Sequence, residues 1–93
     1  MSNFYVEFKI KRNGSAVSGG ILVYETTTST QPSRLLSPDT LDRDGYARTS
    51  WDSDTWRNED IDVYCHTDGV NRWKPAYVGR VTLRPHRYEL SVR

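Results

Sequence analysis

Residues 41–51 read Leu-Asp-Arg-Asp-Gly-Tyr-Ala-Arg-Thr-Ser-Trp, an acidic turn followed by an alternating segment. Aspartate side chains bond readily to nearby backbone amides and Gly45 accepts a positive φ, so the first half is expected to reverse the chain. In the second half, Ala47, Thr49 and Trp51 fall on one side of an extended backbone. The stretch therefore predicts a tight turn that leads into a strand of a sheet, with Trp51 in the core.

Segments on both sides of this stretch alternate between apolar and polar residues in the same way. Residues 4–11 keep one apolar face over four repeats, which is typical of a strand in an antiparallel sheet with one buried side. Residues 21–24 are apolar throughout and follow two glycines, which favours a central strand buried on both faces. Further strands are expected at residues 34–36, 61–66, 77–83 and 88–92.

The spacing of these segments indicates the fold class. About seven short strands are separated by turn signals roughly every 8–12 residues, as in a β-sandwich. No segment keeps a 3.6-residue period, and only residues 53–60 could hold one helical turn. The sequence therefore predicts an all-β fold, a single seven-stranded antiparallel β-sandwich over residues 1–93, with Greek-key topology as one candidate.

Three short motifs have counterparts in one protein family. Residues 17–24, Val-Ser-Gly-Gly-Ile-Leu-Val-Tyr, correspond to the form V-x-G-A-x-V-x-V. Residues 41–47 correspond to T-D-x-x-G-x-[FYA], with Leu41 where the family usually has threonine, and residues 61–64, Ile-Asp-Val-Tyr, correspond to I-x-V-x. In this order the motifs resemble the transthyretin-like sandwiches, especially the carboxypeptidase regulatory-like modules. The resemblance implies a transthyretin-like topology and a role as an accessory, folding or contact domain without catalysis.

Composition and charge exclude some functions and leave others open. The 93 residues have a mean hydropathy of −0.75 and a net charge of +1, too little excess charge to indicate nucleic-acid binding. Residues 39–68 carry nine acidic and three basic side chains, whereas residues 69–93 carry one acidic and six basic. We expect these two parts to form ion pairs with each other if their strands are neighbours.

The chain shows no signal for a membrane or for export. No apolar run approaches the roughly 18 residues that span a bilayer, and the start lacks the pattern of a signal peptide. The single cysteine, Cys65, cannot form an intrachain disulfide. We expect cytoplasmic synthesis, with the final location open, including a place in a particle or a secretion machine.

Two D-x-D pairs are the weak candidates for a metal site. Asp42 and Asp44 stand about ten residues before Asp52 and Asp54, and carboxylates at such spacing could bind Ca²⁺. However, Arg43 adds repulsion and the bidentate glutamate of a calcium loop is missing. The alternative is that these aspartates serve turns. We expect no metal and no other cofactor.

Catalytic groups are equally sparse. Cys65 and His66 are adjacent on an expected strand, so they point to opposite faces, and Cys65 is expected to be a buried apolar residue. No nucleophile motif is present. The closing Tyr-Arg-Gly-Ser of the related hydroxyisourate hydrolases is also absent. We therefore expect no enzymatic activity, with a small hydrolase as the weakest alternative.

Large side chains in polar surroundings are the candidate contact residues. Trp56 and Trp73 lie in expected loops, where they could anchor a protein interface, stack on sugar rings or cover the ends of a thin sandwich. Tyr64 and Arg72 complete this set. We expect a non-catalytic structural or protein-interaction module that is part of a larger assembly or self-associates. The alternative is a carbohydrate-binding module that uses the two tryptophans, and neither nucleic acid nor membrane is an expected partner.

Overall fold

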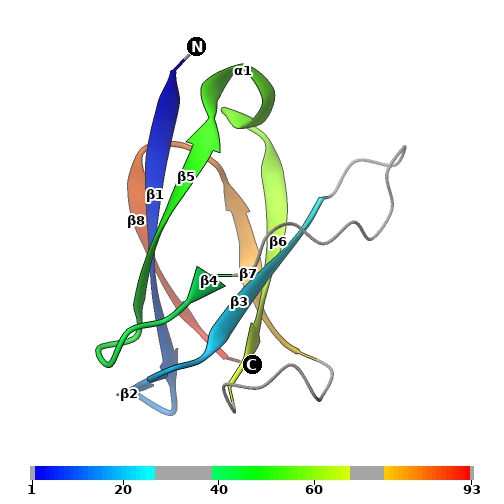
Figure 1. Ribbon diagram of the computed structural model, residues 1–93. Coiled ribbons are helices and arrows are strands. Elements are labelled where there is room, and N and C mark those ends of the chain that lie inside the picture. Colours follow the sequence, from blue (N-terminus) through cyan, green and yellow to red (C-terminus); the bar gives the residue numbers. More distant parts are fainter. Residues whose placement is uncertain (1, 27–38, 68–74, 93) are drawn as a thin grey trace.

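The structure is a computed structural model that describes residues 2–26, 39–67 and 75–92 (Figure 1). Within these ranges the chain is almost entirely β-structure, arranged as two sheets with one short helix. Sheet A contains β1 (Asn3–Arg12), β2 (Ser15–Ala16), β5 (Tyr46–Asp52) and β8 (His86–Ser91). Sheet B contains β3 (Ile21–Thr26), β4 (Asp39–Thr40), β6 (Asp60–His66) and β7 (Ala76–Thr82), and the helix is α1 (Ser53–Trp56).

Strand β1 is the centre of sheet A. It pairs antiparallel with β5 along residues 3–9, antiparallel with β2 at its end, and parallel with β8 along residues 6–11. Sheet B has the order β4-β3-β6-β7 and is antiparallel throughout. Figure 1 shows the two sheets facing each other, with β1 and β5 in one layer and β3 and β6 in the other.

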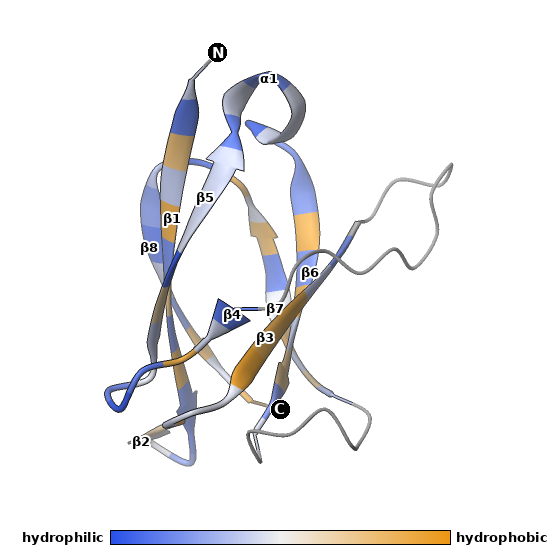
Figure 2. Cartoon of the chain, viewed as in Figure 1, coloured by the Kyte–Doolittle hydropathy of each residue, from blue (hydrophilic) through white to orange (hydrophobic). Residues whose placement is uncertain are grey.

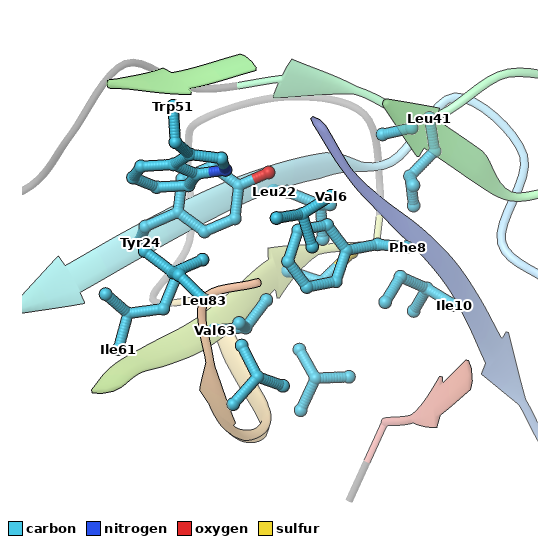
Figure 3. Packing of buried hydrophobic residues seen from close by; sticks show 14 of the residues in the cluster. Val6, Phe8, Ile10, Leu22, Tyr24, Leu41, Trp51, Ile61, Val63 and Leu83 are labelled. Atoms are coloured by element: carbon cyan, nitrogen blue, oxygen red, sulfur yellow. The ribbon is translucent and has the colours of Figure 1, made fainter. Parts of the chain in front are cut away.

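The alternation along the strands fills the space between the sheets. The apolar side of β1 is buried, and along this strand the orange and blue segments alternate in Figure 2. From the facing sheet, Leu22, Tyr24, Ile61 and Val63 enter the same core. Trp51 lies over Tyr24 with ring centroids 5.3 Å apart (Figure 3). The expected inward placement of Trp51 and the expected burial of β3 on both faces are confirmed, since Val23 on its other face is also buried.

The acidic turn forms as expected and packs against β1. Oδ1 of Asp42 accepts hydrogen bonds from the backbone amides of Asp44, at 2.8 Å, and Tyr46, at 3.0 Å. Gly45 has a φ of +79° and is buried, and its carbonyl accepts a bond from the amide of Ile10 at 2.9 Å. A Cβ at Gly45 would lie 2.8 Å from the Ile10 carbonyl oxygen, so this turn requires glycine for two independent reasons.

The buried hydroxyl of Thr49 and the indole N–H of Trp51 both have hydrogen-bond partners. The hydroxyl of Thr49 donates to the carbonyl of Val6 at 3.2 Å, and the indole Nε1–H of Trp51 donates to the Thr49 hydroxyl. Thr49 itself is buried on the inner face of β5. Because a buried donor without an acceptor is expensive, this chain of bonds allows a tryptophan to be buried in a thin core.

The strand count and one strand direction differ from the prediction. The described residues contain eight strands where seven were expected for the whole chain, because β2 and β4 are two-residue strands too short to give a periodic signal. The β1–β8 pair is parallel, so the purely antiparallel sandwich is corrected. The chain passes from sheet B to sheet A between β7 and β8, which frees β8 from hairpin geometry. The strand expected at residues 34–36 lies outside the described residues.

The connection after β5 forms the expected helical turn. The side chain of Asp52 accepts bonds from the amide of Asp54, at 3.3 Å, and from the hydroxyl of Thr55, at 2.8 Å. It thereby caps the first turn of α1, where backbone amides lack partners within the helix. Trp56 ends this helix and packs against the core.

Gly45→Ala should lower the free energy of unfolding by about 2–4 kcal/mol, because it combines a strained positive φ with a clash against the backbone of Ile10. Gly14→Ala is the matched control, since Gly14 has a φ of +83° but has no atom within 4 Å of the added carbon. Gly14→Ala should lower the free energy of unfolding only by the cost of a positive φ at alanine, about 1 kcal/mol. Urea unfolding of both variants measures the difference, and equal losses would contradict the close approach.

Thr49→Val should destabilise the fold by about 1–3 kcal/mol, although it preserves side-chain shape, because it leaves the indole N–H of Trp51 buried without an acceptor. In a Trp51→Phe background the same change should cost less. A double-mutant cycle measured by thermal or urea unfolding isolates this coupling. If the cost of Thr49→Val were the same in both backgrounds, the proposed role of this bond would be wrong.

Candidate functional site

The polar side of sheet A carries the most distinctive set of side chains in the described chain. Because the inner residues of β1 and β5 fill the core, the residues between them all point outward. We call this surface the outer face of sheet A. It consists of Tyr5, Glu7 and Lys9 from β1, Tyr46 and Arg48 from β5, and Arg87 and Glu89 from β8.

Strand register places one carboxylate between two guanidinium groups. Glu7 lies opposite Arg48 on one side and opposite Arg87 on the other. Arg87 Nε contacts Glu7 Oε2 at 3.2 Å, with 55% and 41% of the two side chains exposed. An ion pair this exposed contributes little to stability. Its consequence is geometric, since it holds Arg87 in place while no described carboxylate pairs with Arg48.

Aromatic rings hold the cations of this face in position. The guanidinium of Arg48 lies over the ring of Tyr5, 4.0 Å from its centroid. Lys9 and Arg87 both approach the ring of Tyr46, at 4.9 and 4.7 Å. Tyr5 is 50% exposed, the one large apolar side chain of the described residues with this degree of exposure. The face therefore presents aromatic and cationic groups that are already ordered in the absence of a partner.

A shallow depression lies within this face. It is lined by Glu7, Asp42, Tyr46, Ala47, Arg48 and Arg87 and has a volume of about 260 Å³. The depression is open and most of its lining side chains are charged, whereas pockets for small molecules are usually enclosed and largely apolar. Its shape suits contact with a side chain of another protein better than capture of a free small molecule.

On the outer face of sheet B, the polar and aromatic side chains of β6 and β7 contact each other. Tyr64 packs edge-on against Tyr77 with ring centroids 5.3 Å apart. Arg80 makes two hydrogen bonds to the carboxylate of Asp62, at 3.0 and 3.2 Å, and the Tyr77 hydroxyl donates to the same group at 3.2 Å. The expectation that the acidic middle pairs with the basic end of the chain is confirmed for Asp62 and Arg80.

The predicted contact residues are not brought together. Trp56 is half-buried and packs edge-on against Trp51, with centroids 5.6 Å apart, a placement that fits a cover over the end of the sandwich. Tyr64 is half-buried in sheet B. Trp73 and Arg72 lie outside the described residues.

The four aspartates considered as metal ligands also lie apart. Asp42 and Asp44 precede β5, whereas Asp52 is its last residue and Asp54 follows it, a separation of roughly 20 Å along the strand. The carboxylates of Asp42 and Asp52 accept hydrogen bonds from backbone amides. In the ranges that the structure describes, no three histidine, cysteine or acidic side chains gather as metal ligands would.

Cys65 and His66 are both buried. Burial raises the pKa of the Cys65 thiol to about 11, so the reactive thiolate does not form at neutral pH. The expected burial of Cys65 is confirmed. His66 is also buried, which the strand pattern did not predict, because it lies on the side of β6 that was expected to be outward.

Sequence reasoning missed the pairing of Tyr5 with Arg48 and of Tyr46 with Arg87. Neither these tyrosines nor these arginines were among the contact residues expected from the sequence. Period-two alternation identifies which residues of each strand point outward. The missing information was register, because Arg48 meets Glu7 only when β1 and β5 pair as they do here.

No protein-family model matches this chain, and comparison with curated protein sequences found no match. None of the helical segments in the described parts of the chain has the length and apolar character needed to cross a bilayer.

Asp39 provides a pH-dependent test of the contact between β3 and β4. Burial raises the pKa of this carboxyl above its ordinary value of 3.8, and the bond that it accepts from the Tyr24 hydroxyl, at 2.9 Å, opposes this rise only in part. A raised folded-state pKa means that stability present below about pH 4 is lost as pH rises through the folded value.

Asp39→Asn keeps an acceptor for Tyr24 but removes the half-buried charge. Relative to the wild type, the variant should therefore become more stable as pH increases from 3 to 7. Urea unfolding at a series of pH values measures this change. Asp44→Asn, in an exposed turn, is the control and should show no such gain. A stability difference between Asp39→Asn and wild type that stays constant with pH would contradict the effect of burial.

Proposed function

We propose that this chain is a non-catalytic structural or protein-interaction module whose contact surface is the outer face of sheet A. The observation that carries the proposal is the stack of Arg48 on Tyr5. Both side chains are exposed, they contact each other, and the guanidinium lacks a carboxylate partner among the described residues.

Tyrosine and arginine are, with tryptophan, the residue types enriched among the residues that dominate the binding energy of protein interfaces. Their side chains lose conformational freedom on binding, and a stack formed in advance reduces that loss. The guanidinium presents a planar set of donors that fits a carboxylate in two-point contact. A partner with an acidic side chain flanked by apolar groups would therefore fit Arg48 and Tyr5 together.

The non-catalytic part of the proposal is supported by what the candidate reactive groups do. Cys65 is buried with a raised pKa, and Asp42 and Asp52 accept bonds from the backbone. The resemblance to transthyretin-like modules supports the same role, and we include that topology in the proposal. The half-buried position of Trp56 against the core gives no specific support to carbohydrate binding.

Site-specific photo-crosslinking can test the contact surface. A photoreactive phenylalanine analogue at position 5 should give a discrete protein adduct in cells that produce the chain. The same probe at Thr55, an exposed position on α1, is the control and should not give that adduct. Adding Arg48→Ala to the position-5 variant should reduce the yield about tenfold or more, as expected for loss of a central interface arginine.

The fold of each variant is checked by its unfolding temperature, because Arg48 is exposed and its loss should leave the core unchanged. Equal adduct patterns at positions 5 and 55, or adducts that persist at full yield without Arg48, would show that the outer face of sheet A is not the contact surface.

A further inference from the structure

Strand β8 forms a free edge of sheet A. Among the described residues β1 alone pairs with it, and four of its six side chains are exposed. The amide of Val92, just after the strand, donates to the carbonyl of Lys11 on β1 at 2.9 Å. Backbone groups point to alternate sides along a strand, so those of Arg87 and Glu89 point away from β1. They are available to another strand.

The charges of β8 restrict which strand can pair there. Arg87 and Glu89 share the outer face, two residues apart, and Tyr88 between them points to the core. When two identical strands pair antiparallel, a shift of one residue places outer residues opposite inner ones, which the buried side of the sheet excludes. Three symmetric registers remain in the middle of the strand, centred on Arg87, Tyr88 or Glu89.

Only one of these registers is electrostatically favourable. A pair centred on Arg87 places two arginines opposite each other, and a pair centred on Glu89 places two glutamates opposite each other. Centring on Tyr88 places Arg87 of each copy opposite Glu89 of the other, which forms two cross-strand ion pairs. The strand is therefore complementary to itself in one register.

We propose that a second copy of this chain pairs antiparallel with β8, with the two-fold axis at Tyr88. The two copies of sheet A would join into one continuous sheet with isologous contacts. This inference goes beyond the proposed function, since it names a second copy of the chain as a partner and places that contact at the β8 edge, beside the outer face of sheet A.

The neighbouring strands extend the complementarity on both sides of the axis. Within one copy Glu7 lies opposite Arg87, and Glu89 lies opposite Lys9. Glu89 forms no ion pair with any described residue. The joined sheet would carry an outer row of alternating charge, which reads Arg48, Glu7 and Arg87 of one copy, then Glu89 and Lys9 of the second copy.

The inner side of the edge favours the same contact. Tyr88 and Leu90 pack against the core but remain half-exposed at the border of the sandwich. A second strand beside β8 would cover them. Pro85 lies just before β8 and lacks an amide hydrogen, so it limits the number of backbone hydrogen bonds that the two copies of β8 can form. The short ladder predicts a dimer in concentration-dependent equilibrium with the monomer.

Two charge-reversal variants test the register. Glu89→Arg places like charges opposite each other in the dimer, and so does Arg87→Glu. Each variant alone should dimerise at least about tenfold more weakly than the wild type in sedimentation velocity over a concentration series. In an equimolar mixture of the two, every cross-strand pair is again complementary, so association should return towards the wild-type level.

Asp44→Arg is the matched control for Glu89→Arg, because it makes the same charge change in an exposed turn and should leave dimerisation unaffected. A second measurement uses the wild type alone and does not depend on how well the variants fold. The backbone amides of Arg87 and Glu89 should become more protected from hydrogen exchange as concentration increases, whereas the amide of Asp54 should not change.

A wild type that stays monomeric, or single variants that dimerise like it, would overturn the inference. An equimolar mixture without recovery would also overturn it. These failures can be separated from failure of the proposed function. If adducts from position 5 to a different protein persist in the Glu89→Arg variant, the outer face of sheet A remains a contact surface without β8 pairing. If dimerisation is found but position 5 gives no adduct, the edge alone forms the interface.

Discussion

The close approach of Gly45 to Ile10 is the constraint on which most of sheet A depends. The turn that begins at Asp42 places the carbonyl of Gly45 against the amide of Ile10, with no room for a side chain between them. This contact fixes where β5 starts along β1. Because side chains alternate with a period of two, a slip of one residue at this point would turn Trp51 outward and Arg48 into the core.

The same register that builds the core also builds the candidate contact surface. It places Trp51 over Tyr24 of the facing sheet on the inside. On the outside, it brings Arg48 beside Glu7 and over the ring of Tyr5. The register cannot change for one arrangement without changing for the other, so the neighbours on the outer face are fixed together with those in the core. A surface held in this way needs little reorganisation to bind a partner.

The sequence was sufficient for the fold class and for which residues face inward. Periodicity identified the inner face of β1 and the burial of Trp51 and Cys65, and the turn chemistry of aspartate and glycine identified the turn at Gly45. These properties are local, since they depend on steric preferences within a few residues of the chain. The sequence did not predict that β1 and β8 pair in parallel, because strand direction depends on how the chain crosses between sheets.

The candidate surface was missed for the same physical reason. Residues that form it come from strands far apart in the sequence, and an ion pair between Arg87 and Glu7 joins the two ends of the chain. Expected contact residues were instead chosen for large size in polar loops. Trp56 shows the weakness of that criterion, because α1 turns its ring back onto Trp51 and the core covers part of it.

The charges on the outer face of sheet A follow from this topology. The first strand, β1, lies between the middle strand β5 and the last strand β8, so its outer residues face side chains of both strands. These residues alternate in sign, with Glu7 between two arginines and Lys9 opposite Glu89. A strand that paired with β8 on the side away from β1 would continue this alternation only if it carried the charges of β8 in reverse order. An antiparallel copy of the same strand supplies that order, so one pattern of charge serves both the fold and its proposed assembly.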